Sequence, residues 1–180
     1  VERRRIRPAD VPLDPDQPCT IIFTSGTTAR AKMVPFTQGR LGVQVTSYAG
    51  LMAQPYDPAV CNVNTQPMFH LHGLMFLFLS LACNISVATT HELSVPEYIR
   101  YLRDFSPAWI SAGTAFLQKL LDFGMSDPLF RLPGTVRQVA PGGSHLPPQL
   151  AQAFEARFGF PLVNTYGLTE SQIIASNTVE

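Results

Sequence analysis

The sequence has few charged residues and no excess of either sign. Only 14% of its 180 residues are Asp, Glu, Lys or Arg, and 13 basic residues balance 13 acidic ones. A net charge of zero argues against the basic footprint with which proteins hold nucleic acids and against an electrostatic membrane anchor, so we expect neither partner. Hydrophobic residues make up 46% of the chain. High apolar content with little charge favours strands that are buried on both faces, as in α/β proteins.

Long apolar runs are also missing, and cysteine is scarce. The longest apolar stretch, LMFLFLSLAC, is too short for a transmembrane helix, which needs about 20 residues. The three cysteines, Cys19, Cys61 and Cys83, are odd in number and form no CxxC pair. We interpret them as reduced core residues of an intracellular protein and expect a cytoplasmic location.

Short apolar runs alternate with helical patterns from about residue 60 onward. One helix is expected from the N-cap Thr37 to about residue 53, and another from the N-cap Ser94 to about residue 105. Two more are expected at 114–124 and 147–159, each ending at a glycine. One further helix is expected at 72–82, and strands are expected at 19–24, 33–36, 61–66, 85–90, 108–112, 136–140 and 161–167. This alternation predicts an α/β fold with a mostly parallel sheet and helices on both faces. In such sheets ligands gather beyond the carboxyl ends of the strands.

The chain opens with Val1 rather than Met and continues through an Arg-rich and then a Pro/Asp-rich stretch. We expect residues 1–18 to be a connector from a preceding segment. Residues 19–180 are long enough for one hydrophobic core, and we expect them to form one α/β subdomain of a longer protein.

A hydroxyl-rich loop follows the apolar strand in CTIIFTSGTTARAK. Gly26 lets backbone N–H groups approach a ligand closely, and Lys32 adds a mobile positive charge. Further donors come from the hydroxyls of Thr24, Ser25, Thr27 and Thr28. This composition is typical of a loop that binds a phosphate chain, although the Walker A pattern is absent. The alternative is a polar hairpin turn with a solvated lysine.

A pair of glycines, Gly142 and Gly143, follows another strand in PGGSHLPP. Backbone without side chains offers a surface against which a flat ligand can lie. The alternative is a left-handed turn that leads into the next helix.

An aromatic ring, a glycine, a hydroxyl and a carboxylate come together after the last strand in NTYGLTES. Tyr166 can stack on a base, and Glu170 is a hard oxygen donor suited to a magnesium ion that also holds phosphates. The alternative for Glu170 is an acidic residue that opposes the dipole at the start of a helix.

Two histidines, His70 and His72, stand close together in FHLHG. They are a weak candidate for a metal pair, because no other ligands stand at a recognisable spacing. We instead expect His70 to be buried, hydrogen-bonded and part of the lining of a pocket.

The four motifs, taken in this order, resemble those of the adenylate-forming superfamily, which contains acyl-CoA synthetases, luciferases and the adenylation domains of peptide synthetases. FTSGTTARAK resembles its phosphate-binding signature, S-G-T-T-G-x-P-K-G, and NTYGLTE matches its Y-G-x-T-E. PMFHLHGL resembles its substrate-side motif, in wording closer to acyl-CoA ligases, and PGGSHLPPQL its adenine-side loop. The chain departs from the pattern at Ala29, Ala31 and Met33 in the first loop and at His145 in the third.

The resemblance implies a role for each matching residue. The phosphate chain of ATP would be held by Lys32 together with Thr24, Ser25, Gly26, Thr27 and Thr28. The rest of the nucleotide would contact Gly142, Gly143, Ser144, Asn164, Thr165, Tyr166 and Gly167. Thr169 would donate to the α-phosphate and Glu170 would place Mg²⁺, so that Thr169, Glu170 and Lys32 form the catalytic set. His70, His72 and Gly167 would border the acyl group.

The implied reaction joins a carboxylic acid to ATP as an acyl-adenylate and then passes the acyl group to a thiol, that of CoA or of a carrier protein. A nucleotide-binding remnant without catalysis remains an alternative. A P-loop NTPase lacks support because there is no Walker A loop, and a dinucleotide-binding module lacks support because PGGSHLPP is not G-x-G-x-x-G.

We expect the chain alone to fold without supporting complete turnover. After Y-G-x-T-E the family continues to a ribose-binding aspartate, a hinge and a small domain with a catalytic lysine, and no lysine follows Lys119 here. A sheet separated from its neighbours also exposes apolar surface, and LMFLFLSLAC is the expected patch.

Replacing both Thr27 and Thr28 by Ala in the complete protein should weaken ATP binding more than AMP binding. The change deletes hydroxyl donors that would face the β- and γ-phosphates, which AMP does not have. Calorimetric titration with each nucleotide measures the difference. Equal losses of affinity for the two nucleotides would favour the alternative interpretation of this loop as a plain hairpin turn.

Overall fold

A computed structural model of the chain describes residues 13–24, 31–51, 61–89 and 94–177. Its centre is a parallel sheet of four strands in the order β4-β3-β5-β6. These strands are β3 (Cys61–Asn64), β4 (Ser86–Thr89), β5 (Trp109–Gly113) and β6 (Gln138–Gly142). The helices that alternate with them are α2 (Leu71–Ala82), α3 (Val95–Phe105), α4 (Thr114–Ser126) and α5 (Pro148–Phe158). The predicted α/β alternation and parallel sheet are confirmed.

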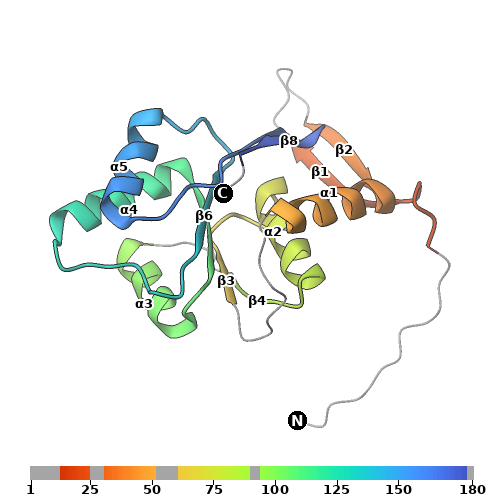
Figure 1. Cartoon of the computed structure of the whole chain (residues 1–180). Coiled ribbons are helices and arrows are strands. Elements are labelled where there is room, and N and C mark those ends of the chain that lie inside the picture. Colours follow the sequence, from red (N-terminus) through yellow and green to blue (C-terminus); the bar gives the residue numbers. More distant parts are fainter. Residues whose placement is uncertain (1–12, 25–30, 52–60, 90–93, 178–180) are drawn as a thin grey trace, which may run out of the picture.

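Successive residues of the central strands pack on opposite faces of the sheet. Trp109 and Ala140 belong to a buried cluster with α2, while Ile110 and Val139 belong to a second cluster with α3, α4 and α5. The first cluster also contains Tyr48 of helix α1 (Gln38–Leu51). Figure 1 shows α3, α4 and α5 on one side of the sheet and α1 and α2 on the other, as the sequence predicts.

An antiparallel hairpin precedes this unit, formed by β1 (Pro18–Thr24) and β2 (Lys32–Thr37). Its inner side chains Ile22, Val34 and Phe36 form a third cluster with residues of α1 and α2. The hydroxyl-rich segment therefore joins the two strands of a hairpin, although residues 25–30 lie outside the described part of the chain.

Three predicted helix caps are confirmed. The hydroxyl of Thr37 accepts a hydrogen bond from the backbone N–H of Arg40 at 3.3 Å, at the start of α1. Ser94 and Glu97 form a reciprocal capping box at the start of α3. Gly159 ends α5 with φ +75°, a left-handed conformation that favours glycine.

The predicted end of α4 at Gly124 is wrong, because the helix continues to Ser126. Gly124 is buried in the helix, and a Cβ there would lie 2.6 Å from Cζ of Phe158 in α5. This glycine is present because two helices approach closely, and sequence alone does not separate that use from a helix stop.

The prediction for residues 161–167 is only partly right. Leu162 makes an isolated parallel bridge to Val139, and the chain then enters a hairpin of β7 (Thr165–Leu168) and β8 (Gln172–Ser176). Glu170 lies in the turn between these strands, so the alternative of an acidic residue at a helix start is wrong.

The expected exposed patch LMFLFLSLAC is largely covered. Met75, Phe76 and Leu79 of α2 are buried, whereas Leu81 is exposed. Other exposed apolar side chains include several on the two hairpins, at Ile21, Phe23, Met33, Tyr166, Leu168 and Ile174. The expectation for the cysteines holds for Cys61 and Cys83, which are buried free thiols, whereas Cys19 is an exposed one. Across the described ranges, no helix combines the length and the hydrophobicity needed to cross a membrane.

Replacing Gly124 by Ala should lower the free energy of unfolding by about 1–3 kcal/mol, because the methyl group overpacks the contact between α4 and α5. The ring of Phe158 cannot yield freely, since it packs against Phe154 with centroids 4.6 Å apart. Gly42→Ala in α1 is the matched control, because a Cβ at Gly42 meets nothing within 4 Å. There we expect a gain of about 0.5–1 kcal/mol. Urea titration compares the two, and a stabilised Gly124→Ala variant would contradict the packing argument.

Candidate active site

A pocket of about 250 Å³ opens beside the carboxyl ends of β5 and β6. Six predicted site residues line it together: His70, His72, Gly143, Thr165, Gly167 and Thr169. The rest of its wall comes from Tyr48, Leu71, Met75, Phe76, Leu168, Gln172 and Ile173. The pocket therefore combines an apolar wall with a few polar groups, which is the usual composition of a small-molecule site.

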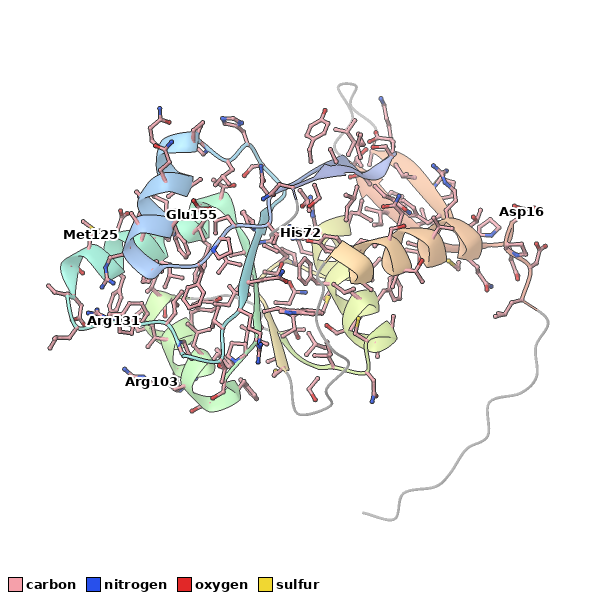
Figure 2. The ribbon with its side chains drawn as sticks, viewed as in Figure 1. Asp16, His72, Arg103, Met125, Arg131 and Glu155 are labelled. Atoms are coloured by element: carbon pink, nitrogen blue, oxygen red, sulfur yellow. The ribbon has the colours of Figure 1, made fainter. Side chains whose placement is uncertain are left out.

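His72 is the less exposed of the two histidines of the pocket, half-buried with a fully buried Nδ1. Its Nε2 lies 3.1 Å from the hydroxyl of Ser111, in the middle of β5. Its ring lies against the backbone of Gly142, where a Cβ would meet Cε1 at 2.5 Å. Burial, and then the neighbouring His70, lower the pKa of His72 to about 4. His72 is therefore a neutral side chain at pH 7, which extends from the start of α2 to Gly142 at the end of β6 (Figure 2).

The expectation that His70 is buried is wrong, because His70 is exposed at the rim of the pocket. It is the N-cap of α2, and its Nδ1 accepts a hydrogen bond from the backbone N–H of His72 at 3.1 Å. This hydrogen bond occupies Nδ1 of His70 and leaves Nε2 for any other partner. Among the described residues, no three His, Cys, Asp or Glu side chains gather as a metal cluster.

The glycine pair forms the turn between β6 and α5. Gly142 is the buried last residue of β6, and Gly143 is exposed with φ +83°, so the left-handed turn is present. Ser144 follows as an exposed residue whose carbonyl accepts a hydrogen bond from the Thr114 hydroxyl at 3.4 Å. Of these three predicted residues, Gly143 alone lines the pocket.

The β7–β8 hairpin places its residues at different distances from the pocket. Thr165, Gly167 and Thr169 line it. Tyr166 is 61% exposed, and Glu170 is exposed in the turn directly after Thr169. Asn164 lies away from the pocket, where its N–H donates to Oδ1 of Asn177 at 2.6 Å.

Thr24 and Lys32 are paired at the open end of the β1–β2 hairpin and do not line the pocket. Lys32 is exposed and Thr24 is half-buried. The other predicted phosphate-binding residues (Ser25, Gly26, Thr27 and Thr28) lie outside the described residues. The structure thus places the ends of this loop and tests no contact to a nucleotide.

Three polar residues of the site were not predicted. Ser111 orients His72, while Tyr48 and Gln172 line the pocket. Ser111 lies in the middle of β5, two residues before its last residue Gly113, so no strand-end signal marks it in the sequence. Tyr48 is brought in from the middle of α1, and Gln172 by the left-handed turn of the β7–β8 hairpin at φ +64°, so neither has a local sequence signal.

A parallel sheet with a glycine turn and a half-polar pocket at its carboxyl ends is the architecture of an α/β protein that binds a small ligand. The whole of residues 2–180 matches the family model described as AMP-binding enzyme, and the chain belongs to this family. The resemblance to adenylate-forming enzymes is confirmed by this match.

Named relatives are CoA ligases. The chain is 30% identical over 161 residues to the sulfoacetate–CoA ligase of Cupriavidus necator, a match that covers 89% of this chain and 30% of the relative. It is 32% identical over 163 residues to the 2-succinylbenzoate–CoA ligase of Bacillus pumilus, with coverage of 89% and 32%. The chain thus spans about a third of the length of these relatives.

A solved structure agrees with the fold over the same extent. The O-succinylbenzoate coenzyme A synthetase of Bacillus subtilis, in complex with ATP and magnesium ion, aligns with a TM-score of 0.79 and 28% identity. The alignment covers 92% of this chain and 34% of that one. The α/β subdomain corresponds to part of the fold of this larger enzyme.

His72 should make the protein less stable in acid. Its pKa falls from 6.5 to about 4 on folding, so the unfolded chain binds the proton more tightly. The stabilising contribution is complete above pH 6.5 and is lost as pH falls towards 4, by about 3 kcal/mol in total. Urea titrations at pH 7, 5.5 and 4 on wild type and His72→Gln isolate this contribution. Identical pH dependence in the two proteins would contradict the burial of a neutral His72.

Proposed function

We propose that the complete protein activates a carboxylic acid with ATP and transfers the acyl group to the thiol of CoA. The products are the acyl-CoA, AMP and pyrophosphate. The observation that carries the proposal is the pocket in which Gly167 and Thr169 of the Y-G-x-T-E motif meet the histidines of the FHLHG motif. Support also comes from the CoA ligases among its relatives.

The first step brings a carboxylate onto a triphosphate, so the site must position two anions. A carboxylate oxygen attacks the α-phosphorus as the bond from that phosphorus to the pyrophosphate oxygen breaks. The acid is already ionised at pH 7, so the step needs no general base. The half-buried hydroxyl of Thr169 lines the pocket and would donate to the α-phosphate. Because His72 is neutral, it does not attract the carboxylate or the triphosphate electrostatically away from its reacting position.

Glu170 fits the expected magnesium site. Its carboxylate is exposed directly after Thr169, so an ion held there would lie close to the phosphates at the mouth of the pocket. Mg²⁺ is commonly bound through one or two carboxylates together with phosphate oxygens and water, and one glutamate meets that requirement. Bound there, the ion would neutralise charge on the phosphates.

The nucleotide would lie outside the deep part of the pocket, against the exposed residues that frame its mouth. The exposed Tyr166 ring offers a face for the adenine, and Gly143 offers bare backbone. Thr24 and Lys32 hold the two ends of the hydroxyl-rich loop, which would cover the β- and γ-phosphates.

The acceptor in this proposal is CoA rather than a carrier protein, because the relatives named above are CoA ligases. The remainder of the enzyme would supply the ribose contact and the second domain. The reaction is placed in the cytoplasm, where the acceptor thiol stays reduced.

Isotope exchange between pyrophosphate and ATP tests the adenylation step. Exchange in the complete protein should depend on an added carboxylic acid, and AMP should be released when CoA is then supplied. Nucleotide binding without acid-dependent exchange would favour the non-catalytic remnant.

Replacing Glu170 by Gln should reduce adenylation by at least about a hundredfold at saturating Mg²⁺, because the change removes an anionic ligand and keeps the shape. Acyl transfer from preformed acyl-adenylate should suffer less. Glu97→Gln is the matched control, since Glu97 is an exposed carboxylate of a capping box in which Gln is also suitable. Near-normal pyrophosphate exchange in Glu170→Gln would contradict the assignment of Glu170 as a magnesium ligand.

A further inference from the structure

Three buried polar atoms without partners line the same pocket. They are Oη of Tyr48, Nε2 of Gln172 and Nδ1 of His72, and none has a hydrogen-bond partner of good geometry among the described residues. The Thr165 side chain lies near Tyr48 and the Gly142 backbone near His72, in poor hydrogen-bond geometry. Tyr48 and Gln172 are each only 2% exposed. In Figure 2, His72 lies at the start of α2, on the side of the central sheet that faces α1.

An unpaired buried polar atom is unfavourable, because it has lost its hydrogen bonds to water without gaining others. Such atoms also occur elsewhere in the described chain, at Tyr98 and Trp109 for example, where they face packed side chains. Those that line the pocket differ, because they border a cavity of about 250 Å³ that a ligand can enter. A ligand can therefore supply partners there and nowhere in the packed clusters.

The chemistry of these groups limits what can satisfy them. The Gln172 amide nitrogen is a donor only, and the Tyr48 hydroxyl donates readily. Burial raises the pKa of Tyr48, so its hydroxyl keeps the proton. Both residues therefore present N–H or O–H groups, and an oxygen acceptor on the ligand is the complementary group.

We propose that the acid activated by this enzyme carries an oxygen-bearing polar group beyond its reacting carboxylate, and that Tyr48 and Gln172 bind that group. The inference rests on the proposed function, in which the reacting carboxylate lies near Thr169 at the phosphate side of the pocket. The apolar residues Met75 and Phe76 then enclose the short carbon chain between the two polar ends. Tyr48 and Gln172 act as specificity-determining residues.

The two donors disfavour a purely apolar acid. An alkyl chain bound in this pocket would leave both donors unpaired. Discrimination against it follows from the same cost, since a site built to hydrogen-bond a ligand rejects an analogue that lacks the partner.

The experiment compares acids of matched size in the complete protein. Succinate and 4-oxopentanoate carry a second oxygen group, and hexanoate has the same number of non-hydrogen atoms without one. Acid-dependent pyrophosphate exchange gives kcat/KM for each, and the rise in Tm on adding each acid reports binding separately. Wild type should prefer both polar acids over hexanoate in both measurements.

Two isosteric variants remove the donors, Tyr48→Phe and Gln172→Met. Each should lower the ratio of kcat/KM for 4-oxopentanoate over hexanoate by about tenfold, which is typical of one lost hydrogen bond in a buried site. Tyr98→Phe is the matched control, because its hydroxyl is also buried without a partner but faces the other side of the sheet. It should leave the ratio unchanged. The unliganded Tm of each variant shows whether it is folded, and either variant alone suffices for the test.

The outcomes separate the two levels of the argument. Preference for hexanoate in wild type, or unchanged ratios in both donor variants, would overturn the inference while acid-dependent exchange upholds the proposed function. If none of the acids supported exchange between pyrophosphate and ATP, the proposed function would be overturned. The Tm measurements then decide about the pocket: a rise with polar acids that Tyr48→Phe abolishes supports polar recognition, and equal rises with all acids overturn it.

Discussion

Burial of both faces of a short parallel sheet is the constraint on which the remaining structure depends. Trp109 and Ile110 are neighbours in β5, yet they belong to two different hydrophobic clusters on opposite faces of the sheet. Each face needs its own layer of helices, and the crossovers that supply these helices bring the carboxyl ends of all the strands to one edge. The pocket lies at that edge, where Gly143 follows β6 and the start of α2 follows β3.

Much of this architecture could be predicted, because its causes are local in the sequence. The capping box at Ser94, the left-handed end at Gly159 and the alternation of strands and helices each depend on a few neighbouring residues. The errors arise where a distant partner decides. Gly124 looks like a helix stop until Phe158 of another helix packs against it. The turn at Glu170 depends on the pairing of β7 with β8, which a single strand does not reveal.

The site divides in the same way. The motifs predicted Gly143, Thr165 and Thr169, which line the pocket, because these residues follow strands in recognisable order. The roles of the two histidines were harder to assign, since His70 and His72 stand two positions apart and only the start of α2 decides which one points inward. Tyr48 comes from a helix that carries no motif, so only the folded chain places it against the pocket.

The backbone at Gln172 has a further consequence for how this enzyme could change. At φ +64° a glycine would be relaxed, whereas a residue with a Cβ is strained. The chain nevertheless keeps a long amide there, with its side chain buried at the pocket wall. Selection for heat resistance alone would favour glycine at this position, and it would remove a pocket-lining side chain in the same mutation. Thermostability and substrate selectivity are therefore opposed at a single codon, as in other enzymes whose active sites retain strain.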